Sequence, residues 1–431
     1  MKKQIVVGLA LMSLMAFKCG RNNSAVVNPP PRPPQHNLLP SPSVTLIEEP
    51  VGFWNESLLL AIRSDRTAPP LAARAMAMLN LAMFDTINSV RPRYTSYRAN
   101  IRLNPVANPV AGGATAAHRI LISLYPRYKP VFDQQLAQFL SRIPESRAKS
   151  EGIFQGETIA HAMIDSRKAD VVAVVTIPPP APGPGVWRPT PPKHTEFLLS
   201  GWGKVLPFGL ERGDQFRRSV NPPAFNSPAY LQAVEEVRLL GGRISLRRTP
   251  EQTLIANFWS DNAGTVTPPG HWIQIGNAVA KGPGDLLDRS RLFALLSMAL
   301  ADAGIACWDL KLNTYHWRPI TAIRALHDGN WEPLLETPPF PDYVSGHSTF
   351  SGAASRMLSL IFRRDNVPFT IGSDDAPRVV RQYRGFSEAA IEAGRSRIFG
   401  GIHFEFANRD GIRVGNEVAE TIFRNYLLPL K

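Results

Sequence analysis

Three short stretches in the last third of the chain indicate both the fold and the function. They read Lys311-Leu-Asn-Thr-Tyr-His-Trp-Arg318-Pro319, Pro341-Asp-Tyr-Val-Ser345-Gly346-His347 and Ser396-Arg397-Ile-Phe-Gly-Gly-Ile-His403. Together they supply one lysine, two arginines, a serine hydroxyl, glycine backbone and two histidines. No carboxylate stands at the motif positions themselves, so we expect a set of hydrogen-bond donors only. A multiply charged oxyanion requires such a set.

The first stretch carries two cations. Lys311 and Arg318 are about two helical turns apart, and Pro319 marks either the end of a helix or the start of a new one. Such a pair alone is usually part of a solvated helix face. Here three aromatic residues make the segment too apolar for an exposed face, namely Trp308, Tyr315 and Trp317. We therefore expect both cations to face one cavity.

The second stretch follows the proline-rich loop 338–341 and precedes an apolar helical run that begins at Thr349. This order places Ser345, Gly346 and His347 at a helix N-terminus, where free backbone N–H groups and the helix dipole favour an anion. Ser345 taken alone fits an ordinary N-cap equally well. Gly346 allows a ligand to approach the backbone closely.

The third stretch pairs a cation with a histidine. On a continuous helix Arg397 and His403 would point about 120° apart. Gly400-Gly401 lies between them and can break the helix, so that the two side chains converge.

The order Lys-x6-Arg-Pro, Ser-Gly-His and Ser-Arg-x5-His resembles the signature shared by vanadium-dependent haloperoxidases and type 2 phosphatidic acid phosphatases. The clear resemblance runs from about Asp261 to the C-terminus. Two positions depart from it: Val344 stands where the family usually has proline, and Ala407 stands where the phosphatases have an aspartate that orients the nucleophilic histidine. Glu405 and Asp410 are the alternatives for that carboxylate.

The resemblance implies vanadate as cofactor, and hydrogen peroxide and halide as substrates, with hypohalous acid as product. His403 would bind vanadium, His347 would be the acid–base catalyst, and Lys311 would polarise bound peroxide. The residues that the resemblance assigns to the oxyanion are Lys311, Arg318, Ser345, Gly346, His347, Arg397 and His403. The alternative is an acid phosphatase that acts through a phosphohistidine intermediate, with His403 as nucleophile and His347 as leaving-group acid.

Three further positions match the haloperoxidases. Trp308 and Phe340 lie at the offsets of aromatic residues that line the halide site in chloride-oxidising members, although each taken singly fits a core aromatic. Asp261, after Phe258-Trp259, resembles an acidic partner of Arg397 in the shell behind the site.

The N-terminus predicts export. Met1-Lys2-Lys3 and the apolar run 5–17 form a signal peptide (1–19), and Cys19 fits a bacterial lipoprotein cleavage site. A plain secretory signal is the alternative. The proline-rich segment 20–50 then predicts a tether. We expect a cell-envelope protein held to the membrane by lipid on Cys19. The other cysteine, Cys307, fits a buried packing residue.

The rest of the chain predicts an all-α fold of two packed helical bundles, because apolar residues recur at helical spacing and no stretch alternates as a strand does. The expected helices are 58–62, 71–90, 111–124, 132–139, 148–164, 228–240, 250–260, 270–280, 285–306, 348–363, 384–399 and 408–426. The expected divisions after the tether are an N-terminal helical half (51–177), a proline-rich crossover (178–227) and a C-terminal half with the site (228–431). The net charge of +13 is spread along the 431 residues, so we expect no nucleic-acid partner.

Overall fold

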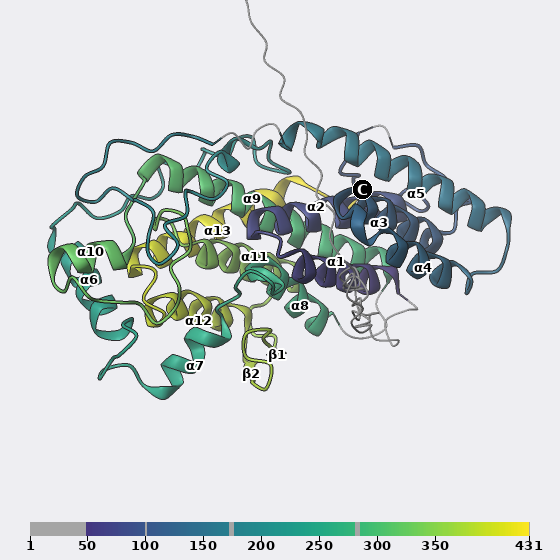
Figure 1. Cartoon of the computed structure of the whole chain (residues 1–431). Helices are drawn as coiled ribbons and strands as arrows, with labels where there is room; N and C mark the ends of the chain where they lie inside the picture. Colours follow the sequence, from purple (N-terminus) through teal and green to yellow (C-terminus); the bar gives the residue numbers. More distant parts are fainter. Residues whose placement is uncertain (1–48, 100, 172–175, 281–284, 431) are drawn as a thin grey trace, which may run out of the picture. The chain divides into compact units, whose positions relative to one another are not determined.

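Helices make up nearly all of the regular structure in the computed structural model, which describes residues 49–99, 101–171, 176–280 and 285–430 (Figure 1). The all-α prediction is confirmed. The predicted signal peptide, Cys19 and almost all of the tether lie outside the described residues. The helices are α1 (Pro50–Asp65), α2 (Pro69–Asn88), α3 (Pro109–Leu124), α4 (Lys129–Leu140), α5 (Arg147–Ser166), α6 (Pro228–Leu240), α7 (Pro250–Phe258), α8 (Thr267–Val279), α9 (Leu286–Thr314), α10 (Pro319–Leu326), α11 (Gly346–Phe362), α12 (Phe386–Phe399) and α13 (Glu405–Asn425).

Prolines and small polar residues determine where many of these helices begin. Six of them start at a proline, where the missing N–H has no intrahelical partner to lose: α1, α2, α3, α6, α7 and α10. Side-chain oxygens cap several of the same ends. Thr249 and Gln252, for example, form a reciprocal capping box at the start of α7.

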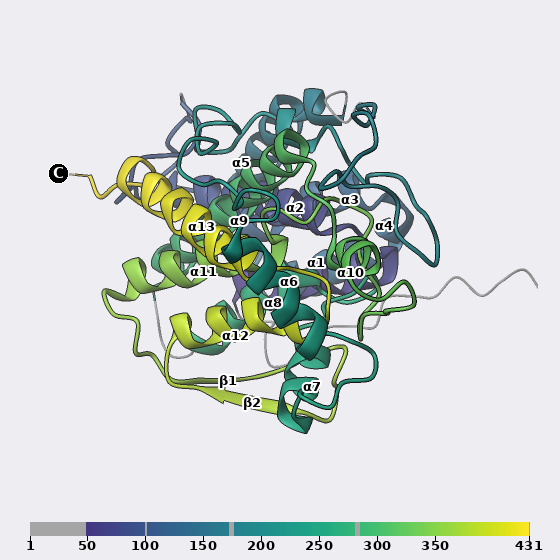
Figure 2. The ribbon, with the colours of Figure 1, turned by 90° about the vertical axis from the view of Figure 1, so that its left-hand side faces the viewer.

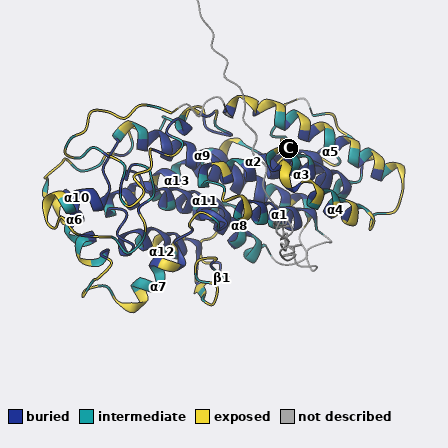
Figure 3. Cartoon of the chain, in the orientation of Figure 1, coloured by how far each residue is buried: buried dark blue, intermediate teal, exposed yellow. Residues whose placement is uncertain are grey.

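The long helix α9 is the centre of the fold. It contacts α2, α11 and α13, and Figure 3 shows these helices to be largely buried. At 29 residues α9 is long and apolar enough to cross a membrane, but its apolar window is entirely buried inside the protein, as in a core helix. It also ends later than the sequence predicts: periodicity suggested an end at residue 306, whereas the helix continues to Thr314 and so includes Lys311.

One hairpin departs from the predicted absence of strands. Strands β1 (Phe369–Gly372) and β2 (Val380–Tyr383) pair antiparallel, with Phe369 opposite Tyr383. Figure 2 shows the hairpin beside α12, which β2 contacts. Each strand has four residues, too few for a recognisable alternation of polar and apolar side chains.

The crossover between the helical halves is irregular but firmly attached to α9. Buried Asp302 accepts hydrogen bonds from the backbone N–H groups of three consecutive residues, 208 to 210, at 2.6, 2.7 and 2.8 Å. About two turns further along α9, Asp309 forms a bidentate ion pair with Arg217. The same helix therefore fixes the crossover and carries part of the site. The boundaries predicted at 177/178 and 227/228 stay predictions.

Candidate active site

The three motif stretches come together at the ends of five helices. Lys311 lies in the last turn of α9, Arg318 is the N-cap of α10, and Arg397 lies in the last turn of α12. Residues 345–347 begin α11, and His403 lies in the turn before α13. The exposed fractions are 0% for Lys311 and Arg318 and 2% for Arg397 and His403, so these polar groups are buried.

Lys311 and Arg318 belong to different helices, although their spacing is close to two helical turns. Helix α9 ends at Thr314, and Tyr315 takes the left-handed conformation (φ 48°), so the chain turns before Arg318. The Lys311 ammonium donates to the carbonyls of Pro341 and Val344, both at 2.7 Å, and of Asp342, at 3.1 Å. All three N–H bonds of the ammonium are thus used by one loop.

Arg318 binds the same loop and the turn that carries His403. Its Nε donates to the Phe340 carbonyl (2.7 Å), and Nη1 donates to the Ile402 carbonyl (2.6 Å) and lies 3.0 Å from His403 Nε2. Its Nη2 is buried and has no hydrogen-bond partner. One donor of this guanidinium therefore remains available for a ligand.

His403 is held on its other side by a carboxylate. Its Nδ1 lies 2.8 Å from Oδ1 of Asp342, which is fully buried. Because a guanidinium only donates, His403 Nε2 accepts from Arg318 and the ring proton is on Nδ1. The neutral ring therefore presents a lone pair on Nε2 beside the cations.

Asp342 is the functional residue that the sequence analysis missed, and the expected donor-only set is wrong. Glu405 and Asp410 were the expected substitutes for the carboxylate absent at Ala407, and neither takes that place. Glu405 pairs with Arg395, and Asp410 accepts from the Tyr343 hydroxyl. Asp342 lies in the second of the three motif stretches, but it is 61 positions from His403 in the sequence, and no local sequence pattern links the two residues.

Two glycines form the turn between Arg397 and His403, as predicted. Helix α12 ends at Phe399, and Gly401 has φ +77°. A Cβ at Gly401 would lie 2.2 Å from the Gly241 carbonyl oxygen, so both the conformation and the space require glycine. The Ile402 N–H donates to the Arg397 carbonyl at 3.0 Å, and this bond fixes the backbone directly before His403.

The start of α11 supplies backbone donors and a second histidine. Ser345 is the N-cap, and its hydroxyl oxygen accepts from the Ser348 N–H at 3.4 Å, which leaves its own O–H free to donate. A Cβ at Gly346 would meet only the Trp308 ring, at 3.7 Å, so there is space above this backbone. His347 is partly buried, and its Nε2 is buried without a partner.

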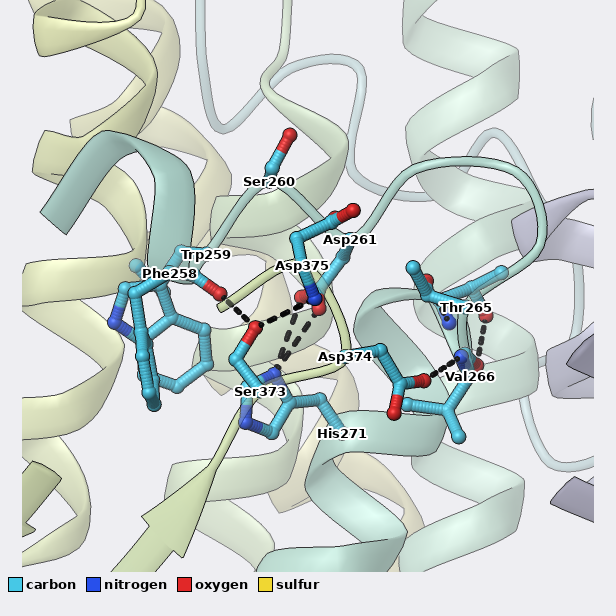
Figure 4. Close-up of polar contacts among 12 residues, drawn as sticks. Phe258, Trp259, Ser260, Asp261, Thr265, Val266, His271, Ser373, Asp374 and Asp375 are labelled. Atoms are coloured by element: carbon cyan, nitrogen blue, oxygen red, sulfur yellow. Dashed lines mark hydrogen bonds and ion pairs between the residues drawn. The ribbon is translucent and has the colours of Figure 1, made fainter. Parts of the chain in front are cut away.

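Arg397 is braced by backbone, and the predicted role of Asp261 stays a prediction. The Arg397 Nη1 donates to the Trp259 carbonyl at 2.7 Å, and its Nε has no partner. Asp261 interacts with the His271 ring (Figure 4), with Oδ1 3.1 Å from Nδ1, and forms no hydrogen bond or ion pair with Arg397. Its negative charge still acts on the guanidinium, since it raises the pKa of Arg397 against the larger, opposite effect of burial.

The two aromatic residues of the expected halide pocket are in contact with each other and with the cations. The rings of Trp308 and Phe340 have centroids 5.0 Å apart. The Phe340 centroid is 5.0 Å from Lys311 Nζ and 4.9 Å from Arg318 Cζ. The Trp308 indole N–H donates to the Leu198 carbonyl of the crossover at 3.0 Å. The pair therefore forms one apolar wall of the site.

Burial shifts the pKa of the three cations, the two histidines and Asp342 toward the neutral form of each group. It lowers the pKa of Lys311 to about 7, of Arg397 to about 9 and of Arg318 to about 10. It raises the pKa of Asp342 to about 7, although Arg318 and Lys311 oppose the shift. It also lowers the pKa of His347 and His403 well below the ordinary value. The buried cations therefore lack sufficient negative charge, which a bound anion would supply.

Comparison with known proteins agrees with this geometry. A family model described as the VCPO second helical-bundle domain matches residues 291–428. The vanadium chloroperoxidase of Curvularia inaequalis is 27% identical over 82% of this chain and 78% of its own length. A bacterial vanadium-dependent iodoperoxidase structure aligns with TM-score 0.78 and 28% identity, covering 88% of this chain and 97% of that one.

The chain is thus similar to vanadium haloperoxidases in both sequence and fold. The fold also matches an apo-type bacterial vanadium-dependent chloroperoxidase, with TM-score 0.68 at 16% identity over 83% of this chain and 94% of that one. The residues present fit the vanadate that these relatives imply, because two buried guanidinium nitrogens have no partner: Arg318 Nη2 and Arg397 Nε. A tetrahedral oxyanion would satisfy donors of this kind.

The lowered pKa of Lys311 predicts that anion affinity falls as pH rises. Below pH 7 Lys311 is charged and Asp342 is neutral; above pH 7 Lys311 is neutral and Asp342 is charged. Both changes make the site less positive, so sulfate, whose own charge is constant between pH 5 and 9, should bind more weakly through about pH 7. Isothermal titration calorimetry across this range measures the effect.

The matched comparison is Lys311→Gln against Lys193→Gln, a surface lysine paired with Glu336. Lys311→Gln should reduce the pH dependence of the sulfate dissociation constant, and Lys193→Gln should leave it unchanged. A flat profile in the unmodified protein would contradict the assignment of these charges.

Proposed function

We propose that this protein is a vanadate-dependent haloperoxidase that oxidises halide with hydrogen peroxide to hypohalous acid. The observation that carries the proposal is the cluster of three buried cations around His403, whose Nε2 lone pair is directed toward them by Asp342. The relatives named above are a chloroperoxidase and an iodoperoxidase, which supports halide as the substrate class.

The residues that would hold vanadate have distinct tasks. His403 Nε2 would be the ligand of the metal, and Arg318, Arg397, the Ser345 hydroxyl and the Gly346 N–H would donate to its oxygens. When bound, the cofactor supplies Lewis-acid activation of peroxide. Lys311 can contribute a donor only by exchanging one of its three loop carbonyls, so its role depends on a small rearrangement of the 341–344 loop.

His347 is suited to proton transfer. Burial keeps its ring neutral, and the unpaired Nε2 can accept a proton from peroxide and later return it. The backbone at Ser260 and Trp259 raises the pKa of His347 against the larger effect of burial. Trp308 and Phe340 would exclude water and present an apolar, cation-flanked surface to a halide.

The phosphatase alternative keeps one specific observation in its favour. The sequence argument against it rested on Ala407, but Asp342 gives His403 the carboxylate that a nucleophilic histidine needs. The two functions are therefore separated by experiment: vanadate-dependent halide oxidation against turnover of a phosphate monoester by vanadate-free protein.

Protein prepared without vanadate should show little bromide oxidation, and orthovanadate should restore it, with phosphate competing for the site. His403→Ala should abolish the restored activity because the metal ligand is lost. His347→Ala should still bind vanadate but turn over more slowly by about 10² to 10⁴, the usual contribution of acid–base catalysis. Halogenation of a dye with peroxide and bromide measures each rate.

His327→Ala, which changes an exposed histidine outside the site, is the control and should behave as the unmodified protein. Efficient phosphate-monoester hydrolysis, with no vanadate-dependent halogenation at any halide concentration, would replace the proposal with the phosphatase.

Changes at the aromatic wall should alter halide preference more than vanadate affinity. Trp308→His and Phe340→His change the surface next to the cations without removing a donor to the oxyanion. We expect the ratio of bromide to iodide oxidation rates to change while the vanadate dissociation constant stays within a few-fold. Trp331→His, at a buried tryptophan bonded to the Arg238 carbonyl, controls for the general effect of the substitution. Loss of vanadate binding with unchanged halide selectivity would refute the halide-pocket assignment.

We also propose export to the bacterial cell envelope with a lipid anchor on Cys19. The support is the basic start and apolar run before Cys19, followed by the proline-rich segment 20–50. Protein expressed in a bacterial host should fractionate with membranes, and Cys19→Ala should fractionate with soluble protein. A membrane-bound Cys19→Ala variant processed like the unmodified protein would end the proposal.

A further inference from the structure

We infer that Asp342 is the positioning residue of His403 and makes the site select vanadate over phosphate. The inference rests on the haloperoxidase function proposed above, because it concerns the bond between His403 and the cofactor metal. It assigns to the loop before α11 the task that the phosphatase pattern gives to an aspartate at the position of Ala407.

The hydrogen bonds of the His403 ring are compatible with only one tautomer of the neutral imidazole. Nδ1 lies 2.8 Å from Asp342 Oδ1, and Nε2 lies 3.0 Å from Arg318 Nη1. A carboxylate accepts and a guanidinium donates, so the proton is on Nδ1 and the lone pair is on Nε2. The His403 ring and the Asp342 carboxylate are both buried, with exposed fractions of 2% and 0%, so water does not compete for either bond.

The position of Asp342 is itself fixed by the backbone around it. Its N–H donates to the His316 carbonyl at 2.8 Å, and its carbonyl accepts from Lys311 Nζ at 3.1 Å. Two nearby carbonyls of the same loop, those of Pro341 and Val344, accept from the same ammonium at 2.7 Å. The carboxylate is therefore placed by contacts that do not involve His403, and it can orient the imidazole before any ligand binds.

No other carboxylate among the described residues forms a hydrogen bond or ion pair with His403. Ala407 is fully buried in the first turn of α13, and its carbonyl accepts from the Ser345 N–H at 3.0 Å. Asp410, in the next turn, is bonded to the Tyr343 hydroxyl at 2.8 Å and to Arg409. His316 Nδ1, 3.9 Å from Asp342, is bonded to the Trp317 carbonyl at 3.0 Å. The Asp342–His403 pair therefore has no substitute.

The two oxyanions depend on this pair differently. Vanadate binding includes a bond from His403 Nε2 to the metal, whose strength depends on ring orientation and basicity. Phosphate bound reversibly is held by the cations and backbone donors alone. Removing the negative charge of Asp342 strengthens the binding of both anions alike, so this effect cancels in the ratio of their dissociation constants. Removing the orientation of the His403 ring weakens the binding of vanadate only.

The test is the ratio of orthovanadate to inorganic phosphate dissociation constants, measured by calorimetry on vanadate-free full-length protein. Asp342→Ala should weaken vanadate relative to phosphate by about 10- to 100-fold, the usual effect of losing a partner of a metal-ligating histidine. Asp410→Asn is the matched control, since it changes a neighbouring buried carboxylate that does not touch His403. It should leave the ratio unchanged.

An unchanged ratio in folded Asp342→Ala, or an equal loss of both affinities, would overturn the inference. A second measurement needs no variant: ¹⁵N imidazole spectra of the unliganded protein, with His403 assigned by its absence in His403→Gln, should show Nδ1 protonated and Nε2 bare. A proton on Nε2 would overturn it equally. Neither readout requires turnover, so a protein that lacks halide oxidation but shows the expected ratio would refute the proposed function and leave the role of Asp342 standing.

Discussion

The burial of three cations around one histidine is the constraint on which the rest of this structure depends. Buried ammonium and guanidinium groups are costly unless they are paired or hydrogen-bonded. Here backbone carbonyls provide most of the compensation: the 340–344 loop accepts from both Lys311 and Arg318, and the turn at Ile402 accepts from Arg318. Carbonyls stabilise the charges without neutralising them. The site therefore keeps its attraction for an oxyanion, and the same bonds fix the loop that carries Asp342.

Helix ends provide the precision that this arrangement needs. Each functional group lies in the first or last turn of a helix, or directly beside one, and the helices themselves are fixed by packing on α9. The crossover is attached to that helix through Asp302 and Asp309 and reaches the site through the Leu198 carbonyl, which accepts from Trp308. A change in the crossover can thus reach the aromatic wall through this bond and through the Leu198 N–H, which donates to the Pro339 carbonyl at 2.9 Å next to Phe340.

The sequence was sufficient for the elements and for most of the site, because both depend on local patterns. Helical periodicity, prolines at helix starts and the Gly400-Gly401 turn are read within a few residues of each other. It was insufficient where a partner is distant or a signal is short. The end of α9 was placed too early, and the hairpin of β1 and β2 went unpredicted. Asp342 was missed for the same reason, since its partner His403 is brought to it only by the fold.

The carboxylate that orients His403 lies at a different sequence position from the one that the phosphatase pattern predicts. A histidine needs an acceptor at Nδ1 to direct its Nε2 lone pair, but the acceptor can come from any element that reaches the ring. The absence of a carboxylate at Ala407 therefore says nothing about whether His403 is oriented, because Asp342 does this from the other side. It follows that this position cannot distinguish a haloperoxidase from a phosphatase. The distinction must lie in groups that the two reactions use differently. The aromatic wall of Trp308 and Phe340 beside the cations is such a group, because we propose that it accommodates halide, which a phosphatase does not bind as substrate.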